Sequence, residues 1–146
     1  MIYATRQDIL DREGANALYA AADRDRDGQV DVVAVDLKLA DASAEIDTFL
    51  SLRYPLPLAT VPPALTRLCI DITLYRLSLS ADVLTKELRQ RYEDAISLLN
   101  KMSRGDVGLG IPVASEPADA GGEVKGGEIL ISAEPRLFTR RSQGGL

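Results

Sequence analysis

Residues 53–79 read RYPLPLATVPPALTRLCIDITLYRLSL, and residues 39–58, which overlap them, read LADASAEIDTFLSLRYPLPL. Pro55 and Pro57 prevent a helix from continuing, because proline lacks an amide proton and restricts the residue before it. Pro62-Pro63 suits the first turn of a new helix, where that amide proton is not needed. The stretch therefore predicts two helices joined by a proline-locked turn, and it contains no catalytic residue pair and no cofactor-binding loop.

Apolar residues recur at helical spacing on both sides of this turn. Thr5, with Asp8 three residues later, suits the start of a first helix, and Gly14 suits its end. Asp31 is placed to cap the helix that precedes the turn. The sequence predicts helices at about 3–14, 16–22, 32–53, 62–79 and 82–103.

The predicted helix 32–53 carries two apolar stripes, a wider face than a single surface helix needs. The first stripe is Val33, Leu37, Ala40 and Ala44, and the second is Val35, Leu39, Ala42, Ile46, Phe49 and Leu50. One edge of this face is expected to pack in the bundle and the other against a neighbouring subunit. The predicted subunit interface is Leu39, Ile46, Phe49 and Leu50.

The 146 residues suffice for one domain with a real core, and the low aromatic share (5%) leaves that core to aliphatic side chains. The chain has no His and one cysteine, Cys69, which lies in an apolar helical pattern and is expected to be a buried thiol. An internal disulfide is therefore impossible. No apolar run reaches bilayer length and no signal peptide is evident, so a soluble, non-secreted protein is expected.

The last third of the chain loses helical periodicity and is rich in Gly and Pro. Residues 105–135 hold six acids and one base, whereas residues 136–146 hold three arginines and no acid. Ile129-Leu130-Ile131 have the composition of a short strand. The predicted fold is all-α, a bundle of about four main helices over residues 1–104, followed by a long extended C-terminal arm, residues 105–146.

The polar loop DRDRDGQVD, which begins at Asp23, partly matches a calcium-binding EF-hand loop. Asp23, Asp25, Asp27 and Asp31 fill ligand positions 1, 3, 5 and 9, and Gly28 fills position 6. Position 12, which should supply a bidentate carboxylate, is Ala34. The same residues suit a polar turn whose aspartates bond to local backbone amides. A turn is the favoured interpretation, and a Ca²⁺ site at the four aspartates is the alternative.

No catalytic arrangement is evident. Without His, a Ser-His-Asp triad is impossible. Glu45 and Asp47 are two residues apart on one helix and cannot act as a pair. A non-enzymatic protein without a cofactor is expected. With a sequence pI near 4.8, the chain also lacks the basic surface of a DNA-binding domain.

The terminal peptide RLFTRRSQGGL, residues 136–146, has the composition of a binding element. Aromatic side chains and arginines are the types that anchor protein contacts. The predicted contact residues are Arg136, Leu137, Phe138, Arg140 and Arg141.

Four segments, in this order along the chain, resemble those of the small head-completion or head-tail adaptor proteins of Mu-like bacteriophages. They are the Asp-Arg-Asp-Arg-Asp-Gly loop, the run from Ala40 to Asp47, the run from Arg53 to Leu58 and RLFTRR at 136–141. The resemblance implies a virion protein at the head-tail junction, assembled in the host cytoplasm. It implies a homo-oligomeric ring of twelve copies beneath the portal, through which DNA passes without sequence-specific binding.

Such a ring would extend the DNA channel and give a tail-side connector or stopper protein its attachment platform, while the C-terminal arm would reach the portal protein. Two other function classes stay open on the residues alone. One is a small Ca²⁺-modulated helical module that binds a partner peptide, and the other is a cytoplasmic regulatory protein with a helical core.

Overall fold

The computed structural model describes residues 1–23 and 27–111. They form five helices and, within those ranges, no strand, which confirms the all-α prediction. The helices are α1 (Arg6–Glu13), α2 (Ala15–Ala22), α3 (Val32–Leu50), α4 (Pro63–Ser80) and α5 (Lys86–Arg104). The proposed strand at 129–131 lies outside the described residues.

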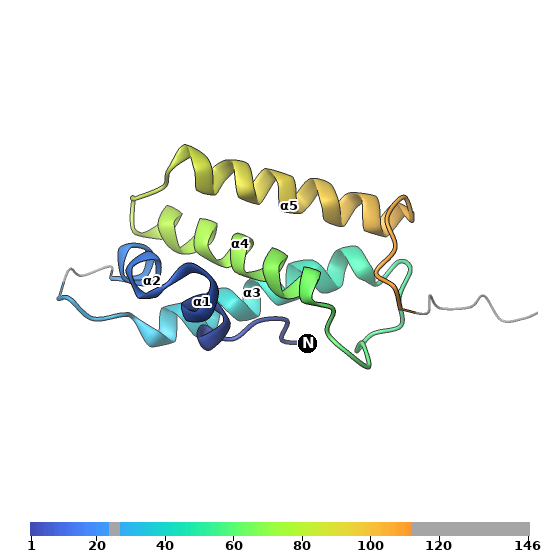
Figure 1. The fold of residues 1–146 in the computed structure, drawn as a ribbon, viewed down its shortest axis with the longest axis horizontal. Coiled ribbons are helices and arrows are strands. Elements are labelled where there is room, and N and C mark those ends of the chain that lie inside the picture. Colours follow the sequence, from blue (N-terminus) through green and yellow to red (C-terminus); the bar gives the residue numbers. More distant parts are fainter. Residues whose placement is uncertain (24–26, 112–146) are drawn as a thin grey trace, which may run out of the picture. The chain divides into compact units, whose positions relative to one another are not determined.

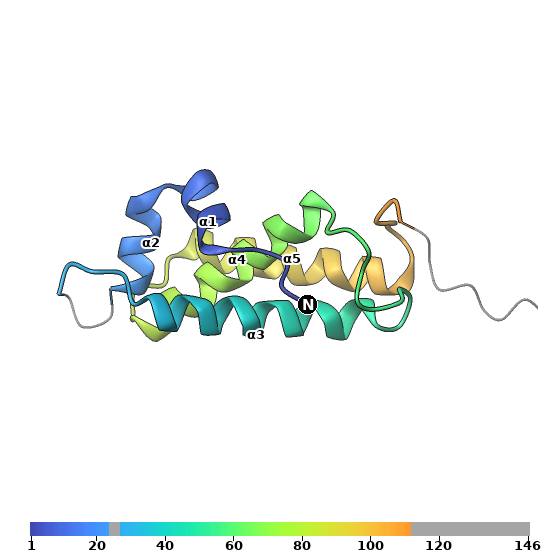
Figure 2. The ribbon, with the colours of Figure 1, turned by 90° about the horizontal axis from the view of Figure 1, so that it is seen from below.

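The three long helices form a bundle in which each contacts the other two (Figures 1 and 2). The short helices α1 and α2 form a hairpin that packs against α4. Figure 2 shows the N-terminal segment running along α3 before α1 begins. The core at the centre of the bundle is aliphatic, and Ile46, Leu65, Ile72 and Leu99 are all fully buried in it.

Local capping signals fix several helix ends. Thr5 and Asp8 form the predicted capping box, and Gly14 ends α1 with a φ of 81°. Asp31 occupies the N-cap position of α3, but its carboxylate caps no backbone amide, so that part of the prediction is wrong. The start of α5 was also misplaced, because Thr85 accepts the amide proton of Leu88 and so begins the helix at Lys86.

Cys69 is buried as predicted, and its Sγ lies 3.5 Å from the hydroxyl of Ser43. Burial raises the pKa of this thiol. A neutral thiol enclosed by the core is a packing group and a poor nucleophile.

The turn between α3 and α4 holds the residues that follow α5. Helix α3 ends at Leu50, before the predicted limit of Arg53. The Tyr54 hydroxyl accepts the amide proton of Leu109 at 3.2 Å. Val107, Leu109 and Ile111 pack, partly buried, against the core. The folded unit predicted to stop at residue 104 therefore extends through residue 111, because these apolar side chains cover the end of the bundle.

The backbone conformation of Gly105 leads to a prediction about stability. Its φ is +86°, and a Cβ added there would lie 2.2 Å from Nη1 of Arg53. Replacing Gly105 with Ala is expected to lower the free energy of unfolding by about 1–2 kcal/mol from the left-handed backbone, whereas the guanidinium of Arg53 lies at the end of a flexible side chain and can move aside. Urea denaturation should detect this loss of stability.

Gly108→Ala is the matched control, since Gly108 has no positive φ and a Cβ there would meet nothing within 4 Å. Equal stability of the two variants would contradict the role assigned to Gly105.

Candidate interaction surfaces

The outer side of α3 presents an apolar ridge, here defined as Val33, Leu37, Ala40 and Ala44. All four side chains are exposed, with Val33 79% and Leu37 58% accessible. The spacing of four, three and four residues places them on one face of the helix. The ridge contains no charged residue, so it forms an uncharged strip along α3.

The ridge corrects the predicted subunit interface. Leu39, Ile46 and Leu50 are 0–4% exposed within the single chain, and Phe49 is half-buried against the same core. Leu39, Ile46 and Leu50 are enclosed by the chain's own core and have almost no surface to offer a neighbour, and Phe49 has only part of its surface. The surplus apolar face of α3 is instead the first of the two stripes seen in the sequence.

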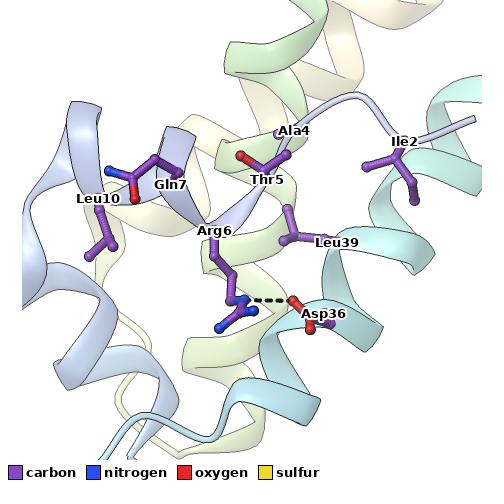
Figure 3. A pocket seen from close by; sticks show the side chains of 8 residues that line it. All are labelled: Ile2, Ala4, Thr5, Arg6, Gln7, Leu10, Asp36 and Leu39. Atoms are coloured by element: carbon purple, nitrogen blue, oxygen red, sulfur yellow. Dashed lines mark ion pairs between the residues drawn. The ribbon is translucent and has the colours of Figure 1, made fainter.

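A groove of about 560 Å³ lies between the N-terminal segment, α1 and α3 (Figure 3). Its apolar lining includes Ile2, Leu10 and Leu39. Arg6 reaches from α1 toward Asp36 on α3, and its Nε lies 2.9 Å from Oδ1 of Asp36 (Figure 3). The lining offers apolar contact and one exposed ion pair, and its Thr5 hydroxyl and Asp36 carboxylate are engaged in the capping box with Asp8 and in the ion pair with Arg6.

A hollow of about 500 Å³ runs along the second half of α5. Tyr92 and Ile96 form its partly buried apolar side. Lys101 and Arg104 line its outer side, are exposed, and form no ion pair with any residue in the described ranges. Exposed Glu93 and the polar residues Ser97 and Asn100 also line it, so this α5 hollow combines apolar and polar side chains with a small excess of positive charge.

An ion network joins α1, α4 and α5 through Arg91. Its Nε donates a hydrogen bond to Oδ1 of Asp71 at 2.8 Å, and its Nη1 donates to Oε2 of Glu13 at 3.0 Å. Asp71 is 2% exposed, and Nε of Arg67 lies 3.8 Å from its Oδ2. Burial raises the pKa of Asp71 against the pull of Arg91. The hydrogen bond from Arg91 lowers the pKa of Glu13.

The sequence pattern does not predict this network, because Arg91 lies among the charged residues of the last helix. Nothing near Arg91 in the sequence identifies its partners, which lie 20 and 78 residues away. The only local hint is Asp71 itself, a lone carboxylate within the apolar run LCIDITL.

Glu45 and Asp47 serve separate structural contacts, as their spacing predicted. Glu45 accepts a hydrogen bond from Nη2 of Arg76 on α4 at 2.7 Å, whereas Asp47 accepts one from the hydroxyl of Tyr3. The pair therefore binds two different neighbours of α3 and has no shared substrate position.

Two aspartates of the polar loop, Asp23 and Asp27, contact its own backbone, as expected for a turn. Oδ2 of Asp23 accepts the amide proton of Gly28 at 3.1 Å, and Oδ1 of Asp27 accepts that of Gln29 at 2.7 Å. Gly28 has a φ of +80°. Asp25 lies outside the described residues. Within residues 1–23 and 27–111 no group of three or more potential ligands is placed to hold a metal ion.

Independence of metal remains a prediction, and it has a direct test. Because the carboxylates of Asp23 and Asp27 already accept backbone hydrogen bonds, the melting temperature and the assembly state are expected to be the same in EDTA and in Ca²⁺. Thermal unfolding and light scattering of the full chain check this. A Ca²⁺-dependent shift in either would support the alternative of a Ca²⁺-modulated module.

The predicted contact residues of the terminal peptide, 136–141, lie outside the described residues. No helix in the described part of the chain is both long and apolar enough to cross a lipid bilayer.

The chain is similar to known phage proteins over most of its length. The sequence pattern of the family described as "Bacteriophage Mu, Gp36" matches residues 3–126. The chain is 35% identical over 120 residues to the Mu-like prophage FluMu protein gp36 of Haemophilus influenzae, covering 82% of this chain and 84% of that protein. It is 29% identical over 145 residues to gene product J of Escherichia phage Mu, covering 99% of both chains. These matches span the helical bundle and the surfaces described above, and the chain belongs to the bacteriophage Mu Gp36 family.

Proposed function

We propose that this Mu-like phage protein is a structural virion component, the subunit of a head-tail connector ring beneath the portal. Full-length similarity to a protein of phage Mu supports a phage role. The apolar ridge on α3 is the observation that carries the proposal further. A ring subunit must offer surface to its neighbours, and the ridge is an extended uncharged strip that the bundle itself leaves uncovered.

The role is a mechanical one. Each subunit would contribute a wall segment to the DNA channel and a platform for the tail-side protein, with twelve copies matching the portal. The chain carries 22 acidic and 17 basic residues. An excess of acid over base disfavours phosphate binding, so DNA would pass such a wall without being held. The proposed role needs no catalytic group and no cofactor.

Docking to the portal is proposed for Arg136, Leu137, Phe138, Arg140 and Arg141. Replacing Phe138 with Ala is expected to weaken portal binding by about 2 kcal/mol or more, because buried aromatic anchors carry much of the energy of an interface. The measurement is co-purification of the full chain with the portal protein, followed by titration. Binding should also weaken as salt rises, since exposed arginine contacts are screened.

Truncation after Glu134 is the companion experiment. The hydrogen bonds and core contacts described above all lie within residues 1–111, so helix content should be unchanged while portal binding is lost. A truncated chain that binds the portal as tightly as the full chain would show that the tail is not the docking element. If the portal protein binds neither the full nor the truncated chain, the proposed function is wrong.

A further inference from the structure

We propose that neighbouring copies of this chain join head to tail, with the α3 ridge of one copy packed into the α5 hollow of the next. The inference rests on the proposed ring and names the two surfaces that would close it. The ridge is Val33, Leu37, Ala40 and Ala44, and the hollow is centred on Ile96.

The two surfaces match in length and in chemical character. At 1.5 Å per residue, the ridge from Val33 to Ala44 is about 16 Å long, and the hollow from Tyr92 to Arg104 is about 18 Å long. The ridge projects exposed aliphatic side chains, whereas the hollow recesses an apolar wall. Packing one against the other would remove from water the most exposed apolar residues of α3.

The charges beside the two surfaces are opposite in sign. Helix α3 carries four carboxylates and one lysine, a net charge of −3, and helix α5 carries five basic and three acidic residues, a net charge of +2. Asp36 and Asp41 border the ridge, and Lys101 and Arg104 outnumber Glu93 among the charged residues that line the hollow. Asp36 is exposed and Asp41 is partly exposed; in their existing ion pairs with Arg6 and Lys38 the two aspartate side chains are 55% and 40% accessible. Pairs of that kind are weak enough to exchange partners.

This charge pattern selects the head-to-tail arrangement over a symmetric one. Pairing α3 with α3 around a two-fold axis would bring aspartates toward aspartates, and pairing α5 with α5 would bring cations toward cations. Contact between two different surfaces is the kind that builds rings when the rotation closes. Complementary charge also sets the register and rejects wrong pairings.

Two charge-reversed variants of the full chain test the contact. The first carries Asp36→Lys and Asp41→Lys, and the second carries Lys101→Glu and Arg104→Glu. Each alone should fail to form oligomers, because both surfaces of one variant are cationic and both surfaces of the other are anionic. An equal mixture should assemble with the variants alternating, since each then meets its opposite. Native mass spectrometry, with and without portal protein, measures the masses, and circular dichroism checks that each variant is folded.

A cysteine cross-link tests the same contact by position. Mixing the Leu37→Cys and Ser97→Cys variants should give a covalent dimer with a short bis-maleimide, because the two residues lie in the ridge and the hollow. Leu52→Cys mixed with Ser97→Cys is the matched control, since Leu52 is 83% exposed but lies outside the ridge. The natural Cys69 is fully buried and does not compete.

The outcomes separate the contact from the function. The contact is wrong if each charge-reversed variant, tested alone, assembles as the wild-type chain does. It is also wrong if the control mixture cross-links as strongly as the test mixture. Either result would leave the proposed ring itself possible. A wild-type chain that stays monomeric even with portal protein would overturn the proposed function and the contact with it.

Discussion

Replacing Arg91 with Met is expected to lower the free energy of unfolding by roughly 3–5 kcal/mol at pH 7. Arg91 is the hydrogen-bonding partner of Asp71, which is 2% exposed. Without it, Asp71 keeps only Arg67, whose Nε is 3.8 Å away and whose side chain is 75% exposed. An ionised carboxylate left in the core without a close partner is strongly destabilising, because its desolvation is no longer offset.

The loss should shrink as pH falls. Burial already raises the pKa of Asp71, and removal of Arg91 raises it further, so the folded variant takes up a proton before the unfolded chain does and gains stability. Glu13 also makes the difference in free energy of unfolding between the wild type and the Arg91→Met variant smaller as pH falls. Arg91 lowers its pKa in the wild type, which stabilises the fold above the unfolded pKa of ~4 and is lost as pH falls through the folded value.

The measurement is urea denaturation of both chains from pH 7 down toward the ordinary carboxyl pKa. The double variant Arg91→Met with Asp71→Asn is the control, because it removes the buried charge together with its partner and should recover much of the lost stability. A loss that is small at pH 7, or equal at all pH values, would show that Asp71 does not depend on Arg91.

Local signals in the sequence were enough to predict most helix ends. The capping box at Thr5 and Asp8, the stop at Gly14 and the proline start of α4 each depend on residues within one turn of the helix end. The start of α5 was misplaced because Asp82 and Thr85 are both capping residue types. The structure gives Asp82 a φ of +57° and places Thr85 in extended backbone, the conformation a cap requires.

Features that depend on tertiary contacts could not be predicted from the sequence. The contacts of Arg91 could not be predicted, because its two carboxylates come from distant helices and no periodicity records such a pairing. Residues 107–111 were assigned to the arm because their apolar side chains lie among glycines, yet they cover the end of the bundle. Helix α3 shows two apolar stripes of similar composition, and only the positions of α4 and α5 determine which one is buried.

The pair Ile46→Ala and Leu37→Ala separates those two stripes by experiment. Ile46 is fully buried, so its truncation should lower the free energy of unfolding by about 2–5 kcal/mol through lost burial and the cavity left behind. Leu37 is 58% exposed, so its truncation should change stability by no more than about 0.5 kcal/mol. Urea denaturation of both variants measures these changes.

Assembly, in contrast, should depend on Leu37. If the ridge joins subunits, Leu37→Ala should reduce the fraction of chain found in oligomers by light scattering, with portal protein present, while leaving the fold intact. Leu52→Ala is the control, because Leu52 is more exposed than Leu37 and lies outside the ridge. If Leu37→Ala and Leu52→Ala assemble as well as the wild type, the exposed stripe of α3 is not the subunit interface. If Ile46→Ala is as stable as the wild type, the assignment of the second stripe to the core is wrong.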